Sequence, residues 1–398
     1  MGDSNYVLVG GQNGTWFEGG QAPRLERIDL DNYTVTTLTL VHSGGAVWGG
    51  GWNGSQWLIS GWGTDDASTG PYIFIYDGAN IIAEHSLDYY GEASSWNGGD
   101  VFAASYNGKE WLLSGLGSGL LSSYGSSNHM ALSIFNGNNF TDLSGSIPKQ
   151  RDRILYTNAW NGQYWLVGGG YMDTGVLFLF DGRRIVDLTN QIAQSVPDFG
   201  SVQALAWNGY YWLIGGVHFL AAYDGYEFTD LTNRLDSVLT SSGSCYTTVN
   251  AIAWNGAEWM LGGGTPVAQT DYSQAWLATY SSRKIVNLTP EIKPPATDFI
   301  PHSSILAITA APNSWVIGGY LKNQGLLYEY SGDSFTNLSN LVSNFTYVNW
   351  VGAGAAQNHI QTSPTTHNHL FPESRMIMCQ YKGWVADALR SFEVYRFD

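Results

Sequence analysis

A short element recurs along this chain of 398 residues and limits what the chain can fold into. "AWNGYYWLIGG" occupies residues 206–216, and "AWNGAEWMLGG" follows at 253–263. The second tryptophan of the element marks the repeat, in steps of 41 to 56 residues, at Trp16, Trp57, Trp111, Trp165, Trp212, Trp259 and Trp315. That period is typical of β-propeller blades rather than of helical solenoids.

Each repeat predicts two β-hairpins. Asn-Gly between apolar runs is the strongest short hairpin signal, because a type I′ turn needs φ > 0 at both central residues. "SVQALAWNG" and "YYWLIGG" are the first predicted strand pair, and "HFLAAYD" and "YEFTDLT" are the second. Four short antiparallel strands make one propeller blade. The glycine pair that ends the second strand predicts a close approach between neighbouring blades.

The repeated tryptophans are predicted to pack between blades. One aromatic side chain buries roughly 150–250 Å², so a ring at an equivalent position in each blade fills the wedge between neighbouring sheets. The same role is predicted for the tryptophans that precede Asn-Gly, which are Trp52, Trp160, Trp207 and Trp254.

The number of blades depends on the C-terminal part. Seven complete units end near Asn340, and residues 378–398 align with 205–224. We therefore predict an all-β fold: one β-propeller over residues 1–398, with four-stranded antiparallel blades. It would have eight blades, the last three-stranded, and a long non-repeat insertion at 343–374. The alternative is seven blades with a C-terminal extension. "FTYVNWVGAGAA" (345–356) resembles "YTTVNAIAWNGA" (246–257), which leaves the register there open.

The repeat resembles the kelch class of propellers. One apolar strand ends in a glycine pair ("WLVGGG", "WLIGG"), and the next ends in an aromatic residue and Asp ("FLFDG", "AAYDG"). The tryptophan that kelch repeats carry on the outer strand is absent, and "FTDLT" or "IVDLT" stands there. Kelch-like propellers include binding modules, surface proteins and a few oxidases, so the resemblance implies the fold and not the activity.

Charge excludes some partners. Lys and Arg total 17 against 33 acidic residues, a net charge of −16. This argues against nucleic acid, which needs a basic footprint, and against docking on anionic lipid. No apolar run is long enough to span a membrane, and the start "MGDSNYVLVGG" shows no signal peptide.

Several features favour an exposed, glycosylatable surface. Only 13% of residues are charged, against about 25% in typical soluble domains. Asn-x-Ser/Thr occurs at Asn13, Asn32, Asn53, Asn139, Asn287, Asn337 and Asn344, although most of these fall where the repeat itself uses Asn and Thr. The two cysteines, Cys245 and Cys379, make no disulfide framework, and a single bridge between them stays open. We expect an extracellular location or one on a cell or virion surface.

Long loops between strands are the predicted binding regions, because propellers bind ligands at loop-lined faces. Aromatic side chains beside short polar ones suit sugar stacking and protein contacts alike. The candidates lie in 61–72, 88–99 and 115–130, and are Trp62, Asp65, Asp66, Tyr89, Tyr90, Trp96, Tyr124 and His129.

One cluster interrupts the repeat and predicts a metal site. His367 and His369 are two residues apart, which places both rings on one side of an extended segment. With His359 they would offer three imidazoles, which suit Zn or Cu. The alternative is a polar surface loop with chance histidines, and Glu373 is the one acidic residue nearby.

The functional prediction is a binding or adhesion module that recognises a protein or carbohydrate partner, such as an envelope or viral attachment component. The nucleophile elbow, P-loop, zinc-protease and dinucleotide motifs are all absent from the sequence. The alternative is a secreted enzyme with its site at the channel mouth, a metal-assisted hydrolase or an oxidase. The sequence leaves the oligomeric state open.

Overall fold

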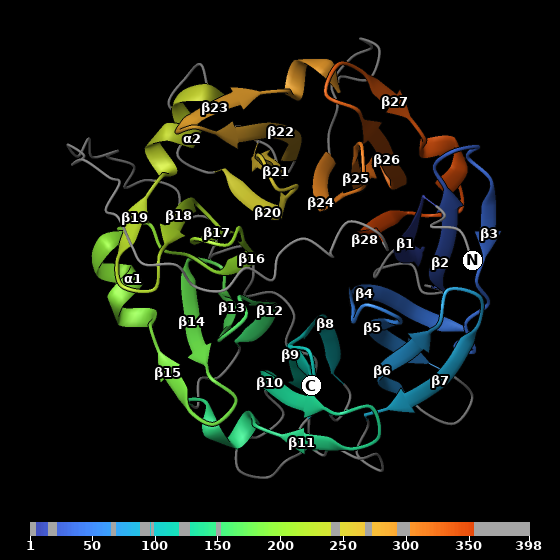
Figure 1. Cartoon of the computed structure of the whole chain (residues 1–398), viewed down its shortest axis with the longest axis horizontal. Helices are drawn as coiled ribbons and strands as arrows, with labels where there is room; N and C mark the ends of the chain where they lie inside the picture. The colour runs from blue at the N-terminus through green and yellow to red at the C-terminus, as the bar shows by residue number, and fades with distance from the viewer. Residues whose placement is uncertain are drawn as a thin grey trace, which may run out of the picture. The chain divides into compact units, whose positions relative to one another are not determined.

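The computed structural model describes residues 5–14, 22–64, 69–87, 96, 99–118, 128–148, 153–239, 247–266, 273–292 and 303–353. The chain divides into two compact units, 1–364 and 365–398, and all described residues belong to the first. Within that unit, seven four-stranded antiparallel sheets form the blades of a propeller ring (Figure 1). The predicted all-β propeller is confirmed.

The four strands of a blade follow one another from the inner edge of the sheet to its outer edge. Blade 1 holds β28 (Tyr347–Ala353), β1 (Tyr6–Asn13), β2 (Ala22–Asp29) and β3 (Val35–Thr37). Blade 2 holds β4 (Gly44–Trp52), β5 (Trp57–Thr64), β6 (Thr69–Tyr76) and β7 (Ile81–Ser86). Blade 3 holds β8 (Asp100–Tyr106), β9 (Trp111–Ser118), β10 (Asn128–Phe135) and β11 (Phe140–Asp142). Blade 4 holds β12 (Ile154–Trp160), β13 (Trp165–Tyr171), β14 (Thr174–Phe180) and β15 (Ile185–Asp187).

Three further blades complete the ring. Blade 5 holds β16 (Val202–Trp207), β17 (Trp212–Gly216), β18 (Phe219–Tyr223) and β19 (Phe228–Asp230). Blade 6 holds β20 (Thr248–Trp254), β21 (Trp259–Pro266), β22 (Ser273–Ser281) and β23 (Lys284–Asn287). Blade 7 holds β24 (Ser303–Ala310), β25 (Trp315–Leu321), β26 (Gln324–Tyr330) and β27 (Phe335–Asn337). Short helices follow several outer strands: η2 (Ser144–Ser146), α1 (Thr189–Ser195), α2 (Thr232–Leu239), η3 (Thr289–Glu291) and η4 (Ser339–Val342).

The ring closes by pairing the two ends of the described chain. β28 is the inner strand of blade 1 and runs antiparallel to β1, from Val7 opposite Ala353 to Gln12 opposite Tyr347 (Figure 1). The prediction of eight blades is therefore wrong, and the alternative of seven is confirmed. The first sequence repeat lacks an inner strand of its own, and residues 347–353 supply it. This explains why these residues resemble the inner strand within 246–257. Residues 354–398 lie outside the described part.

The register predicted for the first unit is also wrong. Val7 pairs with Ile28 just before Asp29, as Trp165 pairs with Phe180 just before Asp181. Val7 therefore occupies the tryptophan position of blade 1, and "YVLVGG" is its second strand. Trp16, predicted to hold that position, lies outside the described residues.

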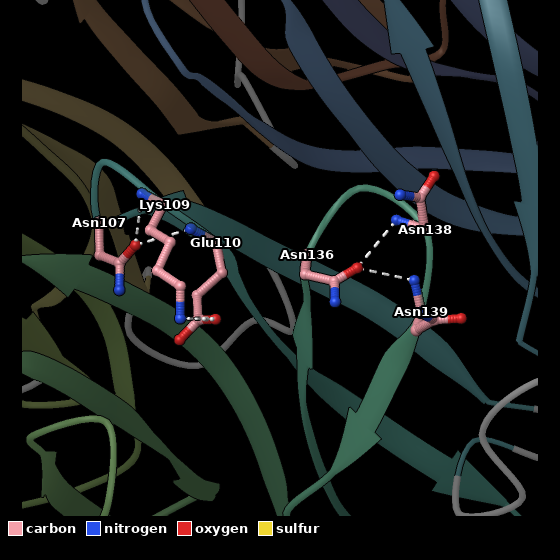
Figure 2. A network of polar contacts seen from close by, with 6 residues as sticks. All are labelled: Asn107, Lys109, Glu110, Asn136, Asn138 and Asn139. Carbon is pink, nitrogen blue, oxygen red and sulfur yellow. Dashed lines mark hydrogen bonds and ion pairs between the residues drawn. The ribbon is translucent and has the colours of Figure 1, made fainter.

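The Asn-Gly and Asp-Gly hairpins are confirmed, but their turns are not type I′. In the turn after β8, Gly108 has φ 95°, while neither Asn107 nor Lys109 has a positive φ. The Asn107 side-chain oxygen instead accepts the backbone N–H groups of Lys109 and Glu110 at 2.9 and 2.8 Å. Figure 2 shows this turn beside that of Asn136, which binds Asn138 and Asn139 in the same way. The asparagine thus closes the turn with its side chain.

The motif that ends each outer strand fixes it to its neighbour. Asp187 accepts the N–H of Thr189 at 2.9 Å, and the Thr189 hydroxyl accepts the N–H of Leu177 at 3.1 Å. The N–H of Leu188 donates to the Leu177 carbonyl at 2.9 Å. We call this arrangement of Asp or Asn, Leu, and Ser or Thr the outer clamp. It recurs at 142–144, 230–232, 287–289 and 337–339. The sequons at Asn287 and Asn337 thus have a structural explanation.

The tryptophans pack as predicted wherever they are described. Six of the seven marker tryptophans are at most 4% exposed: Trp57, Trp111, Trp165, Trp212, Trp259 and Trp315. Their partners before Asn-Gly pack on them, with ring centroids 4.4 Å apart for Trp160 and Trp165. The glycine pairs permit the predicted close approach, since a Cβ on Gly168 would lie 2.4 Å from Val202 of the next blade.

The antiparallel order separates the connections onto two faces. In blades 2 to 7 the first and third connections are short turns, such as 161–164 and 181–184, and we call their side the turn face. Blade 1 has the third connection alone, at 30–34, because its inner strand comes from residues 347–353. The second connection and the link to the next blade lie at the opposite ends of the strands, on the loop face. The strand ends that face 88–99, 119–127, 240–246, 267–272 and 293–302 along the chain lie on the loop face, and we call these stretches the loop-face links.

Candidate functional site

Every inner strand carries one β-bulge at the same position. The pairing register of each inner strand with its neighbour skips one residue, four residues before the strand ends. We call the skipped residues the bulge residues, and they are Trp48, Phe102, Tyr156, Gln203, Asn250, Leu306 and Asn349. Bulges re-aim side chains and are frequent beside functional sites.

The bulge residues differ from the position before them. The preceding residue is always aliphatic and fully buried: Val47, Val101, Leu155, Val202, Val249, Ile305 and Val348. All seven bulge residues are instead partly exposed, although they lie on the strands nearest the middle of the ring (Figure 1). The aliphatic residue packs between blades. The bulge residue after it has no such role, so its residue type differs from blade to blade.

Three consecutive blades contribute aromatic bulge residues, and the rings from neighbouring blades contact each other. The rings of Trp48 and Phe102 lie 5.5 Å apart between centroids, tilted by 42°. Those of Phe102 and Tyr156 lie 5.4 Å apart, tilted by 59°. We call these three residues the aromatic arc. Tilted rings at this separation attract one another, so the arc is a continuous aromatic surface across blades 2, 3 and 4.

A buried carboxyl stands at one end of the arc. Asp100, the first residue of β8, is 8% exposed and accepts the Trp48 indole N–H at 2.8 Å. Burial raises the pKa of Asp100 to about 6, and the hydrogen bond from Trp48 opposes that shift. At the other end, burial raises the pKa of Tyr156 to about 12, with a smaller contribution from Tyr171. The phenol is therefore neutral at physiological pH.

The bulge residues beyond the arc are mostly amides. The Asn250 amide nitrogen donates to the Ser304 hydroxyl at 2.9 Å and to the Ile305 carbonyl at 3.2 Å. The Asn349 nitrogen donates to the Val47 carbonyl at 3.2 Å. Each bond reaches the next blade and fixes the side chain with its oxygen as the acceptor. The ring of bulge residues thus has an aromatic side and an amide side.

Only part of the predicted binding set lies in the described residues. Trp96 is fully buried, and its indole donates to the Ser133 hydroxyl at 2.8 Å, so its place in an exposed binding surface is wrong. Its ring packs against Gly115, in the core of blade 3. Trp62 and His129 are half-buried near the loop-face ends of β5 and β10, opposite Pro71 and Gly117. They remain predictions.

The other candidates lie outside the described residues. For the binding set these are Asp65, Asp66, Tyr89, Tyr90 and Tyr124, and for the metal site His359, His367 and His369. Within the described ranges, no three His, Cys, Asp or Glu side chains are grouped so as to hold a metal ion. Nor does any helix in those ranges have the length and apolarity to cross a membrane.

Sequence reasoning missed the aromatic arc, although a signal for it exists. The position four residues before the end of each inner strand is aromatic in three blades, an amide in three and aliphatic in one, while the position before it is always aliphatic. The bulge cannot be located from the sequence, because apolar and polar residues do not alternate regularly along the inner strands. The sequence therefore favours the long predicted loops that contain aromatic residues as the binding regions.

Comparison with known proteins bears on the fold alone. No protein family and no curated protein matches the chain. The β-propeller domain of the Trilobed protease from Pyrococcus furiosus is 11% identical, with a TM-score of 0.46 over 85% of this chain and 93% of that one. A putative 6-phosphogluconolactonase from Bacteroides fragilis is 11% identical, with a TM-score of 0.47 over 88% of this chain and 98% of that one.

A third solved structure is also a propeller. The Cps50 (Swd1) domain from Myceliophteria thermophila is 12% identical, with a TM-score of 0.45 over 78% of this chain and 92% of that one. These neighbours belong to different kinds of propeller, and the kelch resemblance of the repeat is not confirmed. The chain is a seven-bladed β-propeller whose family the comparisons leave unassigned.

Proposed function

We propose that the protein is a binding module that recognises a protein or carbohydrate partner through its loop face. The observation that carries the proposal is the division of connections between the two faces. On the turn face, short turns are closed by the same Asn or Asp side-chain bonds from blade to blade. The loop face holds links of many lengths, and the links that vary are the ones that provide specificity in propellers.

The kelch-like class and a location on a cell or virion surface belong to the same proposal. Support comes from the charge of −16, the 13% of charged residues and the wealth of aromatic residues in the loop-face links. A surface with few charged groups recognises partners through aromatic anchors and neutral hydrogen bonds. Tyr89, Tyr90 and Tyr124 are the side chains that we propose as anchors.

The test compares tyrosines of the two faces in the full chain. Labelled protein is applied to a glycan array and, separately, to intact cells read by flow cytometry. Variants Tyr89→Ala/Tyr90→Ala and Tyr124→Ala are expected to weaken binding roughly tenfold or more. The matched controls Tyr210→Ala and Tyr226→Ala remove rings that are 74% and 67% exposed in turns of the turn face, and should leave binding unchanged.

Two results would contradict the proposal. Binding that is lost with Tyr210→Ala or Tyr226→Ala, and kept with the loop-face variants, would move the site to the turn face. Absence of binding to every glycan and cell type, from folded protein, would remove the binding function and favour the enzyme alternative.

A further inference from the structure

We propose that the aromatic arc of Trp48, Phe102 and Tyr156 is a carbohydrate-binding site, with a neutral pyranose ring stacked on the arc and its hydroxyls bound by the amide bulge residues. This inference rests on the proposed binding function and names the class of ligand. It places the sugar on the inner strands rather than on the long links.

The first step concerns the aromatic surface. The arc is partly exposed, whereas the aliphatic residue directly before each of its members is fully buried: Val47, Val101 and Leu155. The rings are tilted by 42° and 59° to one another, so the arc offers ring faces in more than one orientation. The C–H face of a pyranose is apolar and matches the extent of one or two such rings. Ligand sites combine apolar walls of this kind with a few fixed polar groups.

The second step concerns those polar groups. Asn250 and Asn349 are fixed by bonds to the next blade, and the Gln203 amide nitrogen bonds to the Ser201 hydroxyl at 3.1 Å. Oriented amides donate to and accept from hydroxyls at little entropic cost. They are the neutral partners that a neutral polyhydroxyl ligand requires.

The third step favours a neutral sugar over a cationic ligand. An aromatic surface can also attract an ammonium ion, and an accessible carboxylate beside the rings would add to that attraction. Among the described residues, Asp100 is the carboxyl bonded to the arc. It is 8% exposed, with one oxygen bound to the Trp48 indole. Its role at the arc is to orient the indole, so it is a positioning residue for the stacking surface.

The experiment uses the full chain and defined probes. Calorimetric titrations are made with methyl glycosides of glucose, galactose, mannose and N-acetylglucosamine, with the matching disaccharides, and with choline as the cationic probe. At least one sugar should bind, and Trp48→Ala and Tyr156→Ala should each weaken its affinity about tenfold or more. Trp48→Phe keeps a ring and should weaken it less. Tyr210→Ala is the matched control on the turn face.

A second readout is made on the wild-type protein by nuclear magnetic resonance, and a variant is used only to assign the signal. The indole N–H cross-peak of Trp48, assigned by its absence in Trp48→Phe, should move when the wild-type protein is titrated with the sugar. Movement of that peak together with loss of affinity in Trp48→Ala supports the proposal. A stationary peak, or choline binding in place of sugar, overturns it.

Failure of this inference is distinguishable from failure of the proposed function. If sugars leave the Trp48 peak unchanged while the Tyr89, Tyr90 and Tyr124 variants still abolish cell binding, the arc is not the site and the binding function stands. If no probe, glycan or cell is bound at all, both proposals fail.

Discussion

At the scale of the residue, two adjacent positions on each inner strand have separate roles. The aliphatic residue, such as Val202, inserts against the glycine of the preceding blade. The bulge residue after it carries variable chemistry at a fixed place. The large repeated tryptophans dominate the sequence, yet they are buried scaffold. The informative aromatics are the three that the bulges present.

Asp100→Asn should change how stability depends on pH. The folded-state pKa of about 6 exceeds the ordinary aspartate value of 3.8, because burial disfavours the charged form. The folded protein therefore holds the proton more tightly, and the contribution of Asp100 to stability falls as pH rises from about 4 to 6. Asparagine keeps an oxygen for the Trp48 indole without the charge. At pH 8 we expect a gain of about 2 kcal/mol in the free energy of unfolding.

Urea unfolding at pH 4 and pH 8 measures this difference. The gain should shrink toward zero by pH 4, where the wild-type carboxyl in the folded protein is protonated. The control is Asp333→Asn, at an exposed position in the turn after β26. Its effect on the free energy of unfolding should be the same at pH 4 and pH 8. An Asp100→Asn protein that is equally or less stable at pH 8 would show that the carboxylate is favourably solvated.

The metal prediction also belongs to single residues. Purified native protein should carry stoichiometric Zn or Cu if His359, His367 and His369 form the predicted site. Elemental analysis by plasma mass spectrometry should show that metal lost in His367→Ala/His369→Ala, because two of three imidazole ligands are gone. The control His85→Ala alters a ring packed on Phe135. If the metal content is the same in the double variant and the wild type, the three histidines do not form the metal site.

At the scale of the element, the outer clamp explains why so short a strand is stable. β15 has three residues, and the Asp187 and Thr189 side chains supplement its backbone ladder with bonds to neighbouring N–H groups. The repeat therefore retains Asp or Asn, Leu, and Ser or Thr for local hydrogen bonding. Glycosylation is not needed to explain those sequons.

Thr189→Ala should destabilise the protein by about 1–2 kcal/mol, because the Leu177 N–H loses its side-chain acceptor. Thr189→Ser retains the hydroxyl and should cost less. The control Thr36→Ala lies on the exposed strand β3 and should fall within about 0.5 kcal/mol of wild type. Urea midpoints with unchanged slope measure all three. Equal stability of Thr189→Ala and wild type would contradict the clamp.

The hairpins show how far elements follow from sequence. Asn-Gly and Asp-Gly located the turns, and the apolar runs located the strands, because both signals are local. The turn type differed, since the Asn107 side chain takes the bonds that a type I′ turn gives to the backbone. The bulges could not be predicted, because they depend on how one strand aligns with its partner. The aromatic arc depends on those bulges, so it was missed too.

At the scale of the whole molecule, the pairing of β28 with β1 holds the ring closed. Counting repeats suggested eight blades, because a count along the chain cannot show that residues 347–353 share one blade with the first repeat. The exposed edge of β1 would otherwise offer unpaired backbone groups to other chains.

Two truncations test this closure. A chain that ends after Pro364 keeps β28 and should unfold cooperatively, within a few degrees of the full chain. A chain that ends after Asn344 loses β28 and should aggregate or unfold without cooperativity, because β1 becomes an open edge. Thermal unfolding and size-exclusion chromatography distinguish these outcomes. Equal loss of stability in both chains would mean that residues after 364 complete the ring.

The most direct test of the central claim, that this ring binds its ligand on the loop face and the adjoining aromatic arc, is hydrogen exchange of the full chain. The protein is compared free and saturated with the tightest-binding glycan of the array. We predict slower exchange at the starts of β4, β8 and β12 and in the links beside them, with none in the turn at 208–211. Slower exchange confined to the Asn-Gly and Asp-Gly turns would contradict the account.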